Sequence, residues 1–138
     1  MSSKLLDTNI LVYAVNTNSE FYKKSQDLVR LHKFFTTSQN IIETYRVITS
    51  IDFYNPQTKS QAKKYLQTIS QLHEVLYPTQ ETTEQLFDLL GKHKINSYQI
   101  FDANLVAIMI ENNIDTIITN NEKDFKKFKS IKIENPFK

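Results

Sequence analysis

The sequence contains no cysteine and only one glycine, and each shortage excludes whole classes of protein. Without cysteine, the chain has no disulfide scaffold, thiolate metal site or cysteine nucleophile. With Gly91 alone, it lacks the glycine-rich loop that binds phosphates in P-loop NTPases and in dinucleotide-binding domains. No apolar stretch approaches the length of a membrane span, and no signal peptide precedes the first expected strand. These features favour a cytoplasmic protein.

A large excess of one charge is also missing. The 17 basic and 15 acidic residues leave a net charge of +2, which does not by itself indicate nucleic-acid binding. Lysines are concentrated near the C-terminus, at Lys123, Lys126, Lys127, Lys129 and Lys132. Such a cluster either forms an ordinary solvated surface or binds phosphates. At 138 residues the chain is long enough for one hydrophobic core, so we predict a single domain over residues 1–138.

Short apolar segments that suit strands alternate with longer amphipathic segments that suit helices. The expected strands are residues 4–6, 34–37, 75–77, 116–119 and 131–133. The expected helices are residues 9–15, 22–31, 41–51, 59–72, 81–92 and 100–112, the last with Phe101, Leu105, Ile108 and Met109 in the core. Such alternation is typical of an α/β fold with a mostly parallel sheet, in which ligands bind at the carboxyl ends of the strands.

Asp7 is the most informative residue, because it directly follows the apolar pair Leu5-Leu6 and precedes the polar pair Thr8-Asn9. A carboxylate in this setting is costly to desolvate unless it has a partner, and a metal ion is one such partner. The alternative is that Asp7 only caps the helix that follows. Thr8 and Asn9 are better placed for capping, so we favour a functional role for Asp7.

Three later segments contain further acids in comparable positions, namely Glu43, Asp102 and Asp124. Asp102 lies beside the apolar stripe of a helix, where an acid is unusual without a counter-charge. Its alternative role is to cap this helix, if the helix begins a residue or two later than expected. Glu43 has an alternative role, because Asn40 and Glu43 have the spacing of a capping box and Arg46 follows three residues later. Asp124 lies in a polar loop, where it also suits a cap for the segment after it. A functional site requires that these acids converge.

Four segments, in chain order, resemble the motifs of PIN domains. The first is Leu6-Asp7-Thr8-Asn9-Ile10-Leu11, and the second is the stretch from Ser38 to Glu43, a serine followed by a glutamate at the start of a helix. The third is Phe101-Asp102-Ala103-Asn104-Leu105-Val106-Ala107, an aspartate that opens a helix of small and apolar residues. The fourth runs from Ile117 to Phe125, with Thr119 after an apolar strand and Asp124 before a phenylalanine. The match spans Leu5 to Phe128, and in size and layout the chain is similar to VapC-type toxins of bacterial toxin–antitoxin pairs.

The resemblance implies a PIN-like three-layer α/β/α sandwich with a central, mostly parallel sheet. It also implies a divalent-metal-dependent endoribonuclease whose catalytic and metal-binding acids are Asp7, Glu43, Asp102 and Asp124. Many PIN domains place the fourth acid two residues after the threonine, where this chain has Asn121. The choice of Asp124 therefore leaves open whether one or two ions bind. Side chains that support the acids or contact the substrate are expected at Asn9, Thr119 and Asn121.

The cofactor implied by the resemblance is Mg²⁺ or Mn²⁺, and the chemistry of the acids agrees with it. Both ions are hard cations that take oxygen ligands, and a divalent ion relieves the repulsion within a cluster of carboxylates. Such an ion lowers the pKa of a water and stabilises charge on the phosphate during attack. No nucleophilic serine or histidine is required. The histidines have no ligand spacing, so we expect them on the surface, at positions His32, His73 and His93.

The resemblance further implies three partners: RNA as the substrate, a cognate antitoxin protein, and a second copy of the chain in a homodimer. The amphipathic helices expected at residues 22–31 and 59–72 are candidate interfaces, and they suit an ordinary outer layer equally well. Two other functions remain open. One is a PIN-fold module that binds RNA or protein without catalysis. The other is a haloacid-dehalogenase-like phosphohydrolase, which requires a second aspartate at the position of Asn9.

Overall fold

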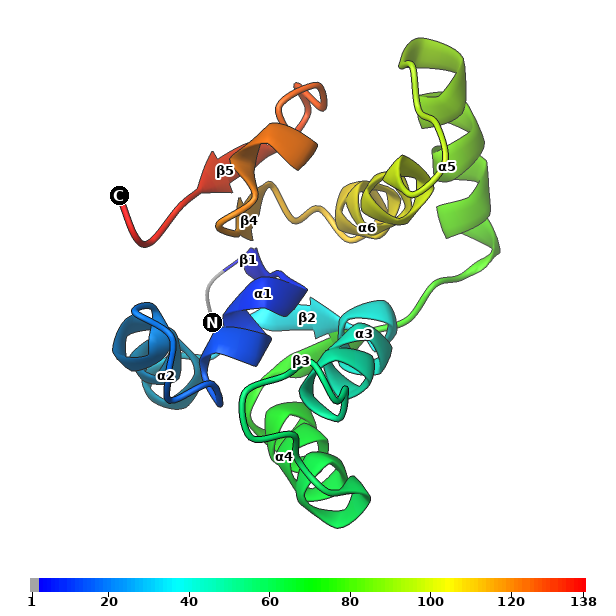
Figure 1. Ribbon diagram of the computed structural model, residues 1–138. Coiled ribbons are helices and arrows are strands. Elements are labelled where there is room, and N and C mark those ends of the chain that lie inside the picture. Colours follow the sequence, from blue (N-terminus) through cyan, green and yellow to red (C-terminus); the bar gives the residue numbers. More distant parts are fainter. Residues whose placement is uncertain (1–2) are drawn as a thin grey trace.

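The computed structural model describes residues 3–138, which form a five-stranded sheet with helices on both faces (Figure 1). The strands are β1 (Lys4–Leu6), β2 (Phe35–Thr37), β3 (Glu74–Leu76), β4 (Thr116–Ile118) and β5 (Lys132–Glu134). Their order across the sheet is β3-β2-β1-β4-β5, and each adjacent pair is parallel. The predicted α/β fold with a parallel sheet is therefore confirmed. Because β1 is central, the residues after it lie beside those that follow β2 and β4.

The helices are α1 (Thr8–Tyr13), α2 (Tyr22–Leu31), α3 (Ser38–Ile48), α4 (Lys59–Leu72), α5 (Gln80–Lys92) and α6 (Gln99–Glu111), and a 3₁₀ turn, η1 (Glu122–Asp124), follows β4. The bounds of α2 and α4 are those predicted from the sequence. The start of α4 has a clear local cause, because the Thr58 hydroxyl accepts a hydrogen bond from the Gln61 N–H at 3.1 Å. Helix α3 begins three residues before its predicted start, and this shift changes the interpretation of Glu43.

Neighbouring residues of each strand pack against opposite faces of the sheet, as the two-residue period of a strand requires. Leu5 of β1 and Ile117 of β4 belong to a core cluster with residues of α5 and α6. Leu6 and Ile118 belong to a second cluster, which includes residues of α1, α2 and α4. Figure 1 shows α5 and α6 on one side of the sheet and α2 and α4 on the other. This arrangement is the predicted three-layer α/β/α sandwich.

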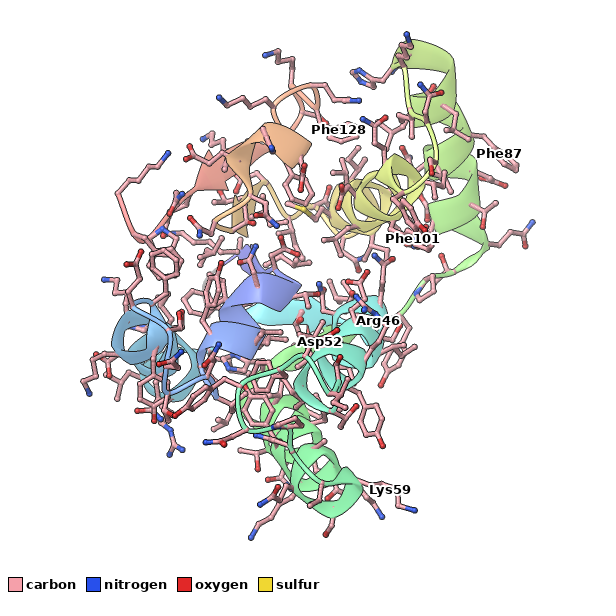
Figure 2. The ribbon with its side chains drawn as sticks, in the orientation of Figure 1. Arg46, Asp52, Lys59, Phe87, Phe101 and Phe128 are labelled. Carbon is pink, nitrogen blue, oxygen red and sulfur yellow. The ribbon has the colours of Figure 1, made fainter. Side chains whose placement is uncertain are left out.

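Two side chains lie elsewhere than the sequence suggested. Phe101, expected in the core, is 50% exposed, because it lies in the first turn of α6, before the part of that helix that is buried between the sheet and α5 (Figure 2). His73, expected on the surface, is buried. Its Nδ1 accepts a hydrogen bond from the Phe34 N–H at 3.1 Å, and its Nε2 lies 2.9 Å from the Val29 carbonyl oxygen. Burial lowers the pKa of His73, which favours the neutral ring. The two contacts link the end of α4 to α2 and to the residue before β2.

Within residues 3–138, no helix combines the length and the apolar character needed to cross a lipid bilayer.

Candidate active site

Three strands deliver polar residues to the same edge of the sheet. Asp7 directly follows β1, Thr119 directly follows β4, and α3 begins at Ser38, directly after β2. Because β1 lies between β2 and β4 and all three run in parallel, their carboxyl ends are neighbours. The first turn of α6 brings Asp102 to the same place, where it lines one hollow together with Asp7 and Glu43.

Asp7 is held by hydrogen bonds on both carboxylate oxygens. The Thr8 N–H donates to Oδ1 at 2.8 Å, and the Thr119 hydroxyl donates to Oδ2 at 2.7 Å. Asp7 is therefore the N-cap of α1, and the prediction that Thr8 or Asn9 caps this helix is wrong, because the helix begins at Thr8. Capping and a place in the site are compatible, since the same carboxylate also lines the hollow. The Asn9 amide donates to the Thr119 hydroxyl at 3.0 Å and supports this arrangement.

The environment of Asp7 raises the pKa of its carboxyl from 3.8 to about 6. Burial is the largest cause, since the side chain is only 8% exposed and the low dielectric disfavours the charged form. The hydrogen bonds from Thr119 and from the Thr8 N–H act in the opposite direction. The charges of Glu43 and Asp124 add to the increase. Without a cation, Asp7 is thus held in a place that opposes its ionisation.

Glu43 lies in the second turn of α3 and is oriented by a chain of polar contacts. The Thr8 hydroxyl donates to Glu43 Oε1 at 2.9 Å, and the Asn40 amide donates to that hydroxyl at 2.9 Å. Asn40 is itself the capping-box partner of Thr37, the true N-cap of α3. The alternative interpretation, a capping box between Asn40 and Glu43, is therefore wrong. The Glu43 carboxylate is not used for capping and is directed toward Thr8, beside Asp7.

Asp102 is partly buried in the first turn of α6, and its pKa rises from 3.8 to about 7. Burial is the largest cause, followed in order by the charges of Asp124, Asp7 and Glu43, whereas Lys127 lowers the pKa. The four predicted acids therefore act on one another through space, although 117 residues separate Asp7 from Asp124 in the sequence.

Asn121 and Asp124 differ in their position relative to the hollow. Asn121 lines the hollow, and its backbone N–H donates to the Thr119 hydroxyl at 3.0 Å. Asp124 does not line the hollow, and it affects the site through its charge on Asp7 and Asp102. It is the last residue of η1 rather than a cap before a helix, so the predicted capping role of Asp124 is wrong.

The hollow has a volume of about 300 Å³, and most of its polar lining residues belong to the predicted motifs. Its lining residues are Asp7, Thr8, Asn9, Val12, Tyr13, Glu43, Arg46, Val47, Asp102 and Asn121. Sequence reasoning missed Thr8 as the contact of Glu43, and Asn40 as the residue that orients Thr8. A local signal for Asn40 exists, because Thr37 and Asn40 also have capping-box spacing.

Hydrogen bonds from two sides hold the loop after β4 in place. The Asn120 N–H donates to Asn9 Oδ1 at 3.3 Å, and the Asn120 amide donates to the Tyr13 hydroxyl at 3.1 Å, so α1 holds the loop. From the other side, the Asn135 amide donates to Asn120 Oδ1 and to Glu122 Oε2, both at 3.1 Å. These contacts hold Asn121 and Asp124 near Asp7.

The donor set fits a hard divalent cation, although the acids do not enclose one as they stand. Within residues 3–138, no three acidic or histidine side chains are close enough together to form a complete metal site. The hollow nevertheless offers carboxylate, hydroxyl and amide oxygens, which are the donors that Mg²⁺ and Mn²⁺ prefer. The raised pKa values of Asp7 and Asp102 arise partly from repulsion among the acids, and a bound cation would remove that repulsion.

Comparisons with known proteins agree with the fold. A family model described as PIN domain matches residues 4–131. The chain is similar in structure to VapBC2 from Rickettsia felis bound to a DNA fragment from their promoter, with 25% identity over 96% of this chain and 97% of that chain and a TM-score of 0.67. It is also similar to VapC20 from Mycobacterium tuberculosis, a sarcin-ricin loop cleaving toxin, with 16% identity, coverage of 91% and 95%, and a TM-score of 0.68. For VapBC-1 from nontypeable Haemophilus influenzae, the identity is 17%, each chain is covered to 98%, and the TM-score is 0.69. No curated protein sequence matches the chain at a significant level.

Proposed function

The chain belongs to the PIN domain family, and on that premise we propose that it is a metal-dependent endoribonuclease that hydrolyses phosphodiester bonds of RNA. One observation carries the proposal. Asp7, Glu43 and Asp102 come from three distant segments and line one hollow at the carboxyl ends of the central strands. A cluster of acids that repel one another lowers the stability of the fold, and a bound cation would neutralise the acids and offset this loss. A metal-binding role therefore explains why the acids lie together.

We assign the metal to Asp7, Glu43 and Asp102, with Asp124 as the fourth acid. When bound, Mg²⁺ or Mn²⁺ supplies charge stabilisation at the phosphate and activates the attacking water. The protein's part is to hold its carboxylates in place. The Thr8 N–H donates to Asp7 Oδ1, and the Thr119 hydroxyl and, at 3.5 Å, the Asn9 amide donate to Oδ2, so Oδ1 keeps a free lone pair. Thr8 also orients Glu43, so the two acids share one support.

The biological role that we propose is that of the toxin of a type II toxin–antitoxin pair, inhibited by a cognate antitoxin protein. The support comes from the similar solved structures, which include VapBC toxin–antitoxin complexes. VapC20, which has the same fold, is described as a sarcin-ricin loop cleaving toxin. Co-expression with candidate antitoxins, followed by recovery of a stoichiometric complex, tests this role.

The predicted homodimer is supported by an apolar groove of about 410 Å³ that residues of α3, α5 and α6 form together with Pro78. Ile42 and Phe101 line this groove and are 70% and 50% exposed. Large apolar side chains with this exposure are typical of a surface that a partner covers. We expect the wild-type protein to sediment as a dimer and Ile42→Asp to sediment as a monomer. A wild-type monomer at high concentration would remove this part of the proposal.

Cleavage of a labelled single-stranded RNA with Mn²⁺, and its loss in EDTA, tests the activity directly. We expect Asp7→Asn, Glu43→Gln and Asp102→Asn to lose activity by at least about a hundredfold, because each removes a charge from the hollow. Asp88→Asn is the matched control, since Asp88 is an exposed acid of α5 that pairs with Lys92. Full activity of Asp7→Asn and Asp102→Asn would end the proposal.

The second candidate function is a PIN-fold module that binds RNA or protein without catalysis. One observation agrees with it: within residues 3–138, no three acidic or histidine side chains are close enough to hold a metal ion as they stand. Calorimetry separates the two, because a module without catalysis takes up no Mn²⁺ at this site. The haloacid-dehalogenase-like alternative is disfavoured by membership of the PIN family and by Asn9 at the position of the required second aspartate.

A further inference from the structure

We propose that Arg46 binds the RNA backbone phosphate next to the one that is cleaved, and so positions the strand over the acidic hollow. This inference rests on the proposed nuclease function and concerns a residue outside the acidic set. Arg46 lies on α3 three residues after Glu43 and lines the same hollow as Asp7, Glu43 and Asp102. Figure 2 shows Arg46 at α3, between α1 and the first turn of α6, where Phe101 is labelled.

The guanidinium of Arg46 is available to a ligand. The side chain is exposed, and none of the ion pairs found within residues 3–138 includes it. A pair with Glu43 is expected from their spacing on the helix, yet Glu43 instead accepts a hydrogen bond from the Thr8 hydroxyl. The contact that directs Glu43 toward Asp7 therefore also leaves Arg46 without its nearest helical partner.

An arginine beside the acids would offset their repulsion of the RNA backbone. A phosphodiester that approaches Asp7, Glu43, Asp102 and Asp124 is repelled by them, and a catalytic metal offsets this repulsion only at the phosphate it contacts. The planar guanidinium donates two parallel hydrogen bonds to phosphate oxygens, which fixes both position and orientation. The neighbouring phosphate of the strand is the group that such a clamp would hold.

Among the cations of residues 3–138, Arg46 is the one that lines this hollow. Lys127 is close enough to lower the pKa of Asp102, but its ammonium donates to the Lys94 carbonyl oxygen at 2.7 Å and does not line the hollow. Arg30, the other arginine of the chain, lies on α2 and lines a different hollow. It therefore supplies a control that is matched in side chain and charge.

Binding of a fluorescein-labelled single-stranded RNA in EDTA, followed by anisotropy over a range of KCl concentrations, tests the proposal without turnover. For Arg46→Ala we expect an affinity loss of about tenfold, as for a lost charged hydrogen-bonding group. The slope of log K against log salt should fall by about 0.7, the value for one single-strand phosphate contact. Arg46→Lys should keep most of the slope but lose part of the affinity, whereas Arg30→Ala should match the wild type.

Kinetics and stability distinguish positioning from a merely structural role. Arg46→Ala should lower kcat/KM by about tenfold, mainly through KM, while the melting temperature stays at the wild-type value. Asp52→Asn tests the structural alternative, because Asp52 and Arg46 line one smaller hollow together. If Asp52→Asn reproduces the defect, Arg46 acts through Asp52 and the proposal is wrong.

The outcomes separate this assignment from the nuclease proposal. Wild-type cleavage with unchanged affinity and salt slope in Arg46→Ala overturns the role of Arg46 alone. A wild-type protein that neither binds nor cleaves RNA overturns both.

Discussion

The Thr119 hydroxyl donates a 2.7 Å hydrogen bond to Oδ2 of Asp7, across 112 residues of sequence. The contact joins the carboxyl end of β4 to that of β1, and it links the loop that carries Asn121 and Asp124 to the first acid of the site. Thr119 is thus a positioning residue, whose effect on a bound ion would pass through Asp7.

Replacing Thr119 with valine should raise the pKa of Asp7 above its present value of about 6, because the hydrogen bond from Thr119 lowers it. Loss of the buried hydrogen bond should reduce the free energy of unfolding by about 1–3 kcal/mol. Carboxyl NMR titration and denaturant unfolding measure the two effects. Thr116→Val is the control, because the hydroxyl of Thr116, at the start of β4, donates to its neighbour Asp115 instead. An unchanged Asp7 titration in Thr119→Val would contradict the assignment.

Asp102→Asn should stabilise the metal-free protein at pH 8, although we expect it to abolish the proposed activity. The pKa of Asp102 is about 7 in the folded protein, above the ordinary 3.8, so the folded state holds this proton more tightly than the unfolded chain. The corresponding stability is complete below pH 3.8 and is lost as the pH rises through 7. Asparagine stays neutral, so we expect its melting temperature in EDTA to exceed that of the wild type by about 2–4 °C at pH 8. The gain should nearly vanish at pH 4, and an equal gain at both pH values would count against this explanation.

Binding of Mn²⁺ should raise the melting temperature of the wild type and release protons near pH 6.5. Stabilisation follows because the ion binds the folded acids and not the unfolded chain. Proton release follows because the pKa values of Asp7 and Asp102 are raised to about 6 and about 7. Calorimetry in two buffers of different ionisation enthalpy measures the protons released. Heats that are independent of the buffer would show that these carboxyls are not the ligands.

His73 should make the protein sensitive to acid. Burial lowers the pKa of His73 below the ordinary 6.5, so the unfolded chain binds the proton more readily than the folded protein. Its contribution to stability is therefore complete above pH 6.5 and is lost as the pH falls below that value. In His73→Gln, an amide that stays neutral replaces the ring, and we expect a smaller loss of melting temperature between pH 7.5 and 5.5. His32→Gln, at an exposed position, should keep the wild-type pH dependence.

Local patterns predicted the order of the elements because the physical causes of helix and strand boundaries are largely local. Helix α4 shows this well, since Thr58 and Gln61 define its start within four residues. The start of α3 was mispredicted because two overlapping pairs, Thr37 with Asn40 and Asn40 with Glu43, have the same capping spacing. The contacts of the folded chain decide between them, because Thr37 and Asn40 form reciprocal hydrogen bonds whereas Glu43 accepts from the Thr8 hydroxyl.

Burial proved harder to predict than helix or strand. His73 is buried by contacts with Phe34 and Val29, which lie 39 and 44 residues earlier. Phe101 has the spacing of a core residue, yet it lies in the first turn of α6 and is half exposed. Helical periodicity says which residues share a face, but not how far along the helix its neighbours extend.

The sequence by itself determined the alternation of strands and helices and the placement of an acid near the end of β1 and at the start of α6. It also identified the PIN motifs, since each motif is a short contiguous run. Only the tertiary structure decided that Asp7, Glu43 and Asp102 line one hollow, that Thr8 rather than Arg46 holds Glu43, and that Asp124 acts from outside the lining. The physical reason is that these relationships depend on strand order and parallel pairing, which bring together groups that are distant along the chain.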